Sequence, residues 1–184
     1  PNTGSYSQIA SSGRWNLFLA YSDRDARNLK FASSSDGGAT WALSVIDPPI
    51  SGVYPSIYAV DGAVYAAYGK ASNDLAFALS TDGGATWEKK IIDTEGSVGY
   101  FNSITADPND MRVAVISYSD LSRLSLKAAV STDGGNTWET AVLSNPRDAG
   151  VYTSADIDPV TGDVYISYYD LSSKDLKIAK GVRS

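Results

Sequence analysis

The feature that most constrains this chain is an eight-residue motif that occurs three times at nearly regular intervals. The copies are SSDGGATW at Ser34–Trp41, STDGGATW at Ser80–Trp87 and STDGGNTW at Ser131–Trp138. The motif tryptophans lie 46 and 51 residues apart, so most of the 184-residue chain is a tandem repeat. A period of about 50 residues restricts the fold to an array of similar supersecondary units.

Tyrosines mark the same period independently of the motif. One tyrosine ends an apolar run in each unit: Tyr21, Tyr68, Tyr118 and Tyr168. A second tyrosine opens each unit: Tyr6, Tyr54, Tyr100 and Tyr152. These markers predict one domain, residues 1–184, made of units 1–53, 54–99, 100–151 and 152–184.

Each complete unit predicts four short strands. In the second unit they are Tyr54–Val60, Val64–Tyr68, Leu75–Leu79 and Trp87–Asp93. The second strand of each unit is almost continuously apolar, which is typical of a strand covered on both faces. Charges interrupt the fourth strand, as expected at an exposed sheet edge. Four-stranded meanders with this gradient predict an all-β fold, a β-propeller of four blade units.

The fourth unit is incomplete, because it lacks the motif and the outer strand that should follow it. Leu176–Lys180 supplies its third strand, and Arg183 stands where the motif aspartate would be. Three arrangements follow from an open last blade. The chain is part of a propeller with more blades, or it closes as a four-blade ring, or copies associate and cover one another's open edge. The sequence alone leaves these alternatives open.

The pattern Ser-x-Asp-x-Gly-x-Thr-Trp resembles the Asp-box, or bacterial neuraminidase repeat, of sialidase-like β-propellers. All three copies match at each defined position. In that family the box is a structural turn on the face away from the active site. The resemblance therefore implies structural roles for Asp36, Trp41, Asp82, Trp87, Asp133 and Trp138. The chemistry agrees, since aspartate accepts hydrogen bonds from turn N–H groups and glycine adopts positive φ.

Composition and spacing exclude several kinds of chemistry. The chain has no cysteine and no histidine, which removes Ser-His-Asp and Cys-His catalysis and the usual zinc sites. Its net charge of −6 argues against a nucleic-acid partner. No apolar run is long enough to span a membrane. The boxes lack the Asp-x-Asp-x-Asp-Gly ligand series of calcium loops, so we expect no metal and no cofactor.

A sialidase would need further residues that the resemblance itself specifies. Sialidases use a tyrosine nucleophile activated by a glutamate, and three arginines that hold the substrate carboxylate. The Phe/Tyr-Arg-Ile-Pro segment that usually precedes the first box is missing, and the nearest arginine, Arg14, is expected on the box side. The glutamates lie on outer strands or in a connecting loop: Glu88, Glu139 and Glu95. The arginines expected in loops opposite the boxes are Arg24, Arg27, Arg123 and Arg147. We therefore expect no catalytic residues, with a sialidase-type glycoside hydrolase, or a fragment of one, as the alternative.

A ligand is expected opposite the boxes, on what we call the loop face. There the unit-opening tyrosines should surround the mouth of a central channel, and acidic residues follow three of the second strands. The candidate ligand-binding residues are Tyr6, Tyr54, Tyr100, Tyr152, Asp23, Asp120 and Asp170. Aromatic rings and carboxylates around a concavity suit sugars or peptides. In the competing interpretation, the rings pack between blades and the carboxylates cap loops.

These observations predict a non-catalytic structural or recognition module that binds a glycan or a protein. The open last blade adds self-association, in which one copy of the chain covers another. We expect the protein outside the cell or at its surface.

Overall fold

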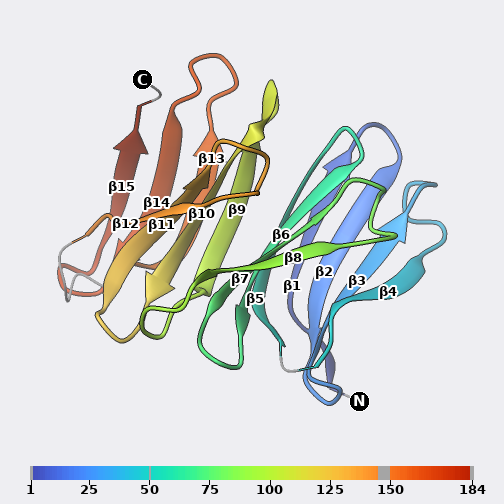
Figure 1. Ribbon diagram of the computed structural model, residues 1–184, viewed down its shortest axis with the longest axis horizontal. Helices are drawn as coiled ribbons and strands as arrows, with labels where there is room; N and C mark the ends of the chain where they lie inside the picture. Colours follow the sequence, from blue (N-terminus) through green and yellow to red (C-terminus); the bar gives the residue numbers. More distant parts are fainter. Residues whose placement is uncertain (1, 50, 145–149, 183–184) are drawn as a thin grey trace.

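The computed structural model describes residues 2–49, 51–144 and 150–182, which form fifteen strands (Figure 1). Arg147 and Arg183, which were named from the sequence, lie outside the described residues. Within the described ranges, no helix has the length and apolar character needed to cross a membrane.

The strands form four antiparallel sheets, which follow one another in chain order. The first sheet contains β1 (Thr3–Ser12), β2 (Asn16–Asp23), β3 (Asn28–Ser34) and β4 (Ala42–Asp47). The second contains β5 (Ser51–Val60), β6 (Ala63–Lys70), β7 (Leu75–Ser80) and β8 (Glu88–Asp93). The third contains β9 (Tyr100–Asp107), β10 (Asp110–Asp120), β11 (Ser125–Ser131) and β12 (Glu139–Val142). The fourth contains β13 (Gly150–Ile157), β14 (Val164–Asp170) and β15 (Asp175–Gly181). Consecutive strands pair within each sheet, so each sheet is a meander, and the last has three described strands, as predicted.

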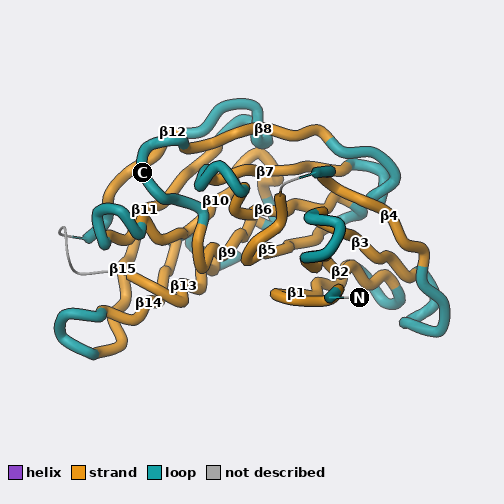
Figure 2. Tube along the Cα trace, turned by 90° about the horizontal axis from the view of Figure 1, so that it is seen from below, coloured by secondary structure: helices purple, strands orange, loops and turns teal. Residues whose placement is uncertain are grey.

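The four sheets stand side by side in an open array (Figure 1). β1 contacts β5, β5 contacts β9, and β9 contacts β13, so the first strands form the inner side of the array. The fourth strands β4, β8 and β12 lie on the outer side (Figure 2). The first and last sheets lie at opposite ends, which excludes the closed four-blade ring for the described residues.

The core lies between neighbouring sheets, and this explains how burial varies along the array. β6 is buried on both faces from Ala63 to Gly69, as predicted for a second strand. β2 and β14 instead alternate between buried and partly exposed side chains. The prediction of two covered faces is therefore wrong for the end sheets, because in the described residues each of them has a neighbour on one side only.

The Asp-boxes join neighbouring sheets as well as closing turns. The ring of Trp87 meets the ring of Phe31 in the preceding sheet edge-on, with centroids 5.1 Å apart. Trp138 meets Phe77 in the same way at 4.9 Å. The backbone of the second box also lies close to the ring of Phe31, since a Cβ on Gly84 would lie 2.0 Å from that ring. The second and third sheets therefore each pack their box onto the third strand of the sheet before them.

Within each box, the aspartate holds the turn through the threonine four residues later. Thr40 donates its backbone N–H to Asp36 Oδ1 at 2.9 Å and its hydroxyl to Asp36 Oδ2 at 2.6 Å. The second and third boxes repeat both bonds. These hydrogen bonds, the threonine hydroxyl first, lower the pKa of each box aspartate to about 2. The geometry matches the structural role that the resemblance implies.

Candidate functional site

A continuous row of aromatic rings runs across the inner strands of all four sheets. The members of this aromatic row are Tyr6, Tyr54, Phe101 and Tyr152. Successive ring centroids are 4.3, 4.7 and 4.6 Å apart, and the rings are tilted by 40–55° to one another. The row thus crosses each of the three junctions between sheets.

The aromatic row lies at the loop face, opposite the boxes. At the start of β1, Thr3 pairs with Asp23, next to the turn that joins β2 to β3. The first box lies at the other end, where the Gly37 N–H donates to the carbonyl of Trp15 at 3.0 Å. The second and third boxes make the matching bonds, so the predicted separation of boxes and tyrosines onto opposite faces agrees with the topology.

Each member of the row occupies an irregular point of its strand and has a left-handed backbone. The φ angles are 51° at Tyr6, 50° at Tyr54, 49° at Phe101 and 56° at Tyr152. The pairing register shifts around each of these residues, as in a β-bulge. Bulky residues rarely adopt positive φ, and such strain, about 1–3 kcal/mol per residue, concentrates at functional sites.

Polar side chains connect the second bulge to the third and the third bulge to the fourth. Asn102 Nδ2 donates to the carbonyl of Tyr54 at 2.7 Å, and Thr153 Oγ1 donates to the carbonyl of Phe101 at 2.7 Å. Each donor directly follows a member of the row in sequence. Hydrogen bonds between sheets therefore fix the strained backbone, and with it the spacing of the rings.

The third member of the row is Phe101, where the sequence predicted Tyr100. Two aromatic residues are adjacent at this point, and the bulge selects the second one. Tyr100 lies beside the row, with its ring centroid 5.8 Å from that of Tyr54. Its hydroxyl donates to Asn73 Oδ1 at 2.8 Å. The sequence holds no consistent signal for this choice, because Asn102 and Thr153 follow two of the bulge residues but Pro55 follows Tyr54.

The rings are accessible to different degrees, most of all at the ends of the row. Tyr152 is 69% exposed and Tyr6 is 38% exposed, while Tyr54 and Tyr100 are half-buried. Burial and the neighbouring Tyr6 raise the pKa of Tyr54 to about 12, so its hydroxyl stays protonated. Arg24 Nη2 donates to the Tyr6 hydroxyl at 3.0 Å and places a cation beside that end of the row.

The predicted aspartates lie at the loop face but beneath its loops. Asp23, Asp120 and Asp170 are buried, at 5%, 0% and 0% exposure. Each carboxylate accepts a loop N–H, from Ala26 at 3.0 Å, Ser122 at 2.9 Å and Ser172 at 2.8 Å respectively. The backbone of Ala26, followed by the side chain of Lys30, lowers the pKa of Asp23. The structure thus brings the tyrosines together, while the three carboxylates accept hydrogen bonds from the loops that cover them.

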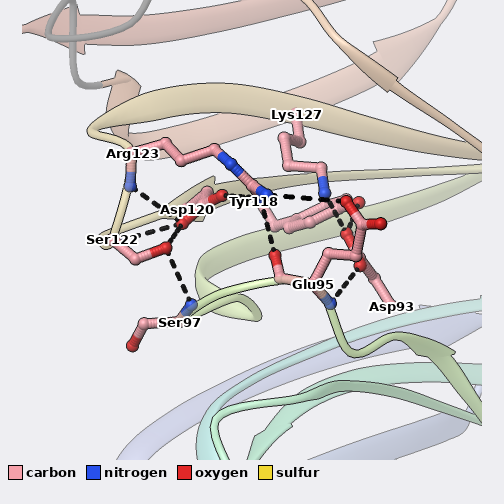
Figure 3. Close-up of polar contacts among 8 residues, drawn as sticks. All are labelled: Asp93, Glu95, Ser97, Tyr118, Asp120, Ser122, Arg123 and Lys127. Atoms are coloured by element: carbon pink, nitrogen blue, oxygen red, sulfur yellow. Dashed lines mark hydrogen bonds and ion pairs between the residues drawn. The ribbon is translucent and has the colours of Figure 1, made fainter.

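A polar network joins the second and third sheets (Figure 3). The Tyr118 hydroxyl donates to Asp93 Oδ2 at 2.7 Å, and Lys127 forms a buried ion pair with the same carboxylate. Arg123 donates to Asp120 Oδ2 and to the carbonyl of Glu95, both at 3.1 Å. The first junction is similar, since Tyr68 and Lys70 bind Asp47. Arg123 is therefore held between sheets.

Comparison with known sequences identifies the repeat. Residues 78–89, which include the whole second box, match the BNR/Asp-box repeat family. No curated protein matches the chain.

Solved structures with the same fold include two sialidases and a lectin. A mutant NanB sialidase from Streptococcus pneumoniae is 18% identical, with a TM-score of 0.64 over 95% of this chain and 29% of its own. Leech intramolecular trans-sialidase with 2,7-anhydro-Neu5Ac is 22% identical, with a TM-score of 0.60 over 91% and 29%. Aleuria aurantia lectin with α-methyl-L-fucoside is 12% identical, with a TM-score of 0.62 over 98% and 58%. The chain spans less than two thirds of each of these proteins, and at such identities the likeness concerns the fold. The chain thus carries Asp-box repeats on a fold similar to that of sialidases, which confirms the resemblance seen in its sequence.

Proposed function

We propose that this chain is a β-propeller-type module that recognises carbohydrate at the aromatic row. The meander sheets, their side-by-side packing and their inner-to-outer order support the propeller part of this proposal, because propeller blades share these features. Non-catalytic recognition, and a location outside the cell or at its surface, are parts of this proposal.

The observation that carries the proposal is the aromatic row itself. Its rings present flat apolar surface flanked by hydroxyl groups, and Arg24 adds a donor at one end. Binding sites for small ligands combine aromatic walls with a few polar groups in this manner. The backbone strain at all four positions supports a role beyond packing, since packing alone does not require positive φ.

The structural neighbours suggest which sugars to test. The fungal lectin was solved with a fucoside, and the leech enzyme was soaked with 3′-sialyllactose. Both proteins have the fold of this chain and both bind glycans. We therefore choose α-methyl-L-fucoside and 3′-sialyllactose as the first probes.

The chemistry of the described residues favours recognition over sialidase catalysis. Burial, with the hydrogen bond to Asp93, raises the pKa of Tyr118 well above its ordinary value. Burial and Asp47 do the same for Tyr68. A tyrosine nucleophile needs the opposite shift, toward the phenolate. Arg123, one of the loop arginines, is paired with Asp120.

Replacing Tyr152 with alanine is expected to weaken glycan binding about 5- to 30-fold, because loss of one stacking ring costs about 1–2 kcal/mol. Tyr165→Ala serves as the matched control, since this tyrosine is exposed and pairs with Asp156 at the box end of the fourth sheet. A glycan array followed by titration with the two probes measures both effects. Absence of binding across the array, or equal losses in the two variants, would contradict the proposal. Turnover of a fluorogenic sialoside would instead support the enzymatic alternative.

Self-association is a second proposed property, and the outer face of the fourth sheet favours it. This face exposes Leu176 to 75% and Ile178 to 68%. The corresponding residues of the second sheet, Leu75 and Phe77, are buried against the third sheet. At the other end of the array, Trp41 is exposed where Trp87 and Trp138 meet a preceding sheet. The two ends are therefore complementary halves of one junction.

A second copy is expected to place its first sheet on the fourth sheet of its neighbour. Native mass spectrometry and sedimentation should show oligomers whose population rises with concentration. Ile178→Asp should shift the population to monomers, while Val160→Asp, at a turn residue that is 90% exposed, should not. A wild-type chain that stays monomeric at high concentration would contradict self-association.

A further inference from the structure

The junction between the third and fourth sheets contains a cavity of about 560 Å³. Its walls are mainly aliphatic. Those from the third sheet include Val115, Ala128 and Val130, and those from the fourth include Val164, Ile166 and Ala179. The cavity lies at the end of the sheets that carries the boxes, because Gly162 in the turn between β13 and β14 also lines it.

The same place is filled by aromatic rings at the preceding junction. Phe77 pairs with Ala67 across β6 and β7, and Ala128 pairs with Ser117 at the same register of the third sheet. By this register, Ala128 replaces Phe77, and Val115 replaces Tyr65. Phe77 and Tyr65 pack in one cluster with Trp138, the tryptophan of the third box. The third and fourth sheets thus leave a space that two rings and an indole occupy between the second and third.

The indole at each earlier junction comes from the box that follows the third strand of the later sheet. In the fourth sheet that strand is β15, whose Gly181 pairs with Val164. Gly181 stands at the register of Ser131, the first residue of the third box, which pairs with Ala114. Along the described residues, β15 pairs with β14 on one side only. An Asp-box and its outer strand would therefore meet β15 at its free edge, beside the cavity.

We infer that this cavity and the edge of β15 form a docking site for an extended polypeptide segment that carries an indole side chain. The tryptophan of the segment fills the cavity, and the residues after it add a fourth strand to the sheet. Strand addition supplies main-chain hydrogen bonds, and the pocket supplies specificity. The partner is defined by the two internal junctions, where Trp87 and Trp138 occupy the equivalent position. The inference does not depend on carbohydrate binding.

The test uses a synthetic peptide that copies residues 130–143 of this chain, VSTDGGNTWETAVL, which contains the third box and β12. Titration of the whole chain with this peptide is expected to show saturable binding. A peptide with alanine in place of tryptophan should bind roughly 10-fold more weakly or worse, since a buried tryptophan is a typical hot spot. Hydrogen exchange should show new protection in Asp175–Gly181.

Two protein variants locate the binding site. Val130→Trp places an indole at a partly exposed wall of the cavity and should abolish peptide binding. Val45→Trp, on β4 of the first sheet, should leave it unchanged. Absence of binding, equal binding of the alanine peptide, or protection elsewhere in the chain would overturn the inference. Free indole that binds as tightly as the peptide would overturn the strand-addition part.

Discussion

Replacing Phe77 with alanine is expected to lower the free energy of unfolding by about 3–5 kcal/mol. Phe77 is 2% exposed and lies where the second sheet receives the box of the third. A Cβ on Gly135 would lie 2.6 Å from its ring, so the ring fills the junction closely. Alanine would leave a cavity bordered by Trp138, and rigid sheets relax only in part around such a space.

The array itself supplies a matched control for this variant. Ile178 occupies the register of Phe77 in the fourth sheet, where it is 68% exposed. At a protein concentration low enough to keep the chain monomeric, Ile178→Ala should change the stability by less than about 0.5 kcal/mol. Urea unfolding followed by tryptophan fluorescence measures both variants. Similar losses at the two positions would show that the packing at the second junction does not stabilise the fold as described.

Replacing Lys127 with methionine is also expected to lower the free energy of unfolding by about 3–5 kcal/mol, because it leaves the Asp93 carboxylate buried without its cation. Lys127 is 4% exposed and Asp93 is 7% exposed. Burial alone raises the pKa of Asp93, but hydrogen bonds from Lys127, the Glu95 N–H and Tyr118 outweigh it and hold the pKa below its usual value. Without Lys127 the pKa of Asp93 should rise, and part of the lost stability should return at acidic pH as this carboxylate is protonated.

Lys89 provides the comparison for a less buried ion pair. Its ammonium lies 3.2 Å from Asp47 Oδ1, but the side chain is 41% exposed and Asp47 also binds Lys70. Lys89→Met should therefore cost less than about 1 kcal/mol. Denaturant unfolding at pH 7 and pH 4 separates the two lysines. A Lys127 variant as stable as wild type at pH 7 would contradict the role assigned to the buried pair.

The parts of the fold that the sequence predicted well are those determined by local patterns. Asp and Thr four residues apart, with two glycines between them, determine the turn in all three boxes. An apolar run ending in tyrosine likewise identified β6 and β10. The three strands of the last sheet in the described residues followed from the absence of a fourth motif.

The parts that the sequence missed depend on contacts between sheets. Tyr100 and Phe101 are equivalent as local signals, and Asn102, which bonds to Tyr54 and Ser56 of the neighbouring sheet, holds the bulge that places Phe101 in the row. From the sequence alone, Lys127 would be expected to face solvent, but in the structure it forms a buried ion pair with Asp93 of the preceding sheet. No local pattern carries this information, because the partners lie more than 30 residues away.

The contacts between sheets also determine how gene duplication could add units to such a chain. Each complete junction joins two unlike surfaces, a box tryptophan on one sheet and a phenylalanine on the sheet before it. A duplicated gene segment that encodes the first or second unit would carry both surfaces, and its product would fit between existing units through the same contacts. Because the surfaces differ, a unit inserted in this way also keeps its orientation. Unit-by-unit duplication thus lengthens the array while the aromatic row gains one ring for each added sheet.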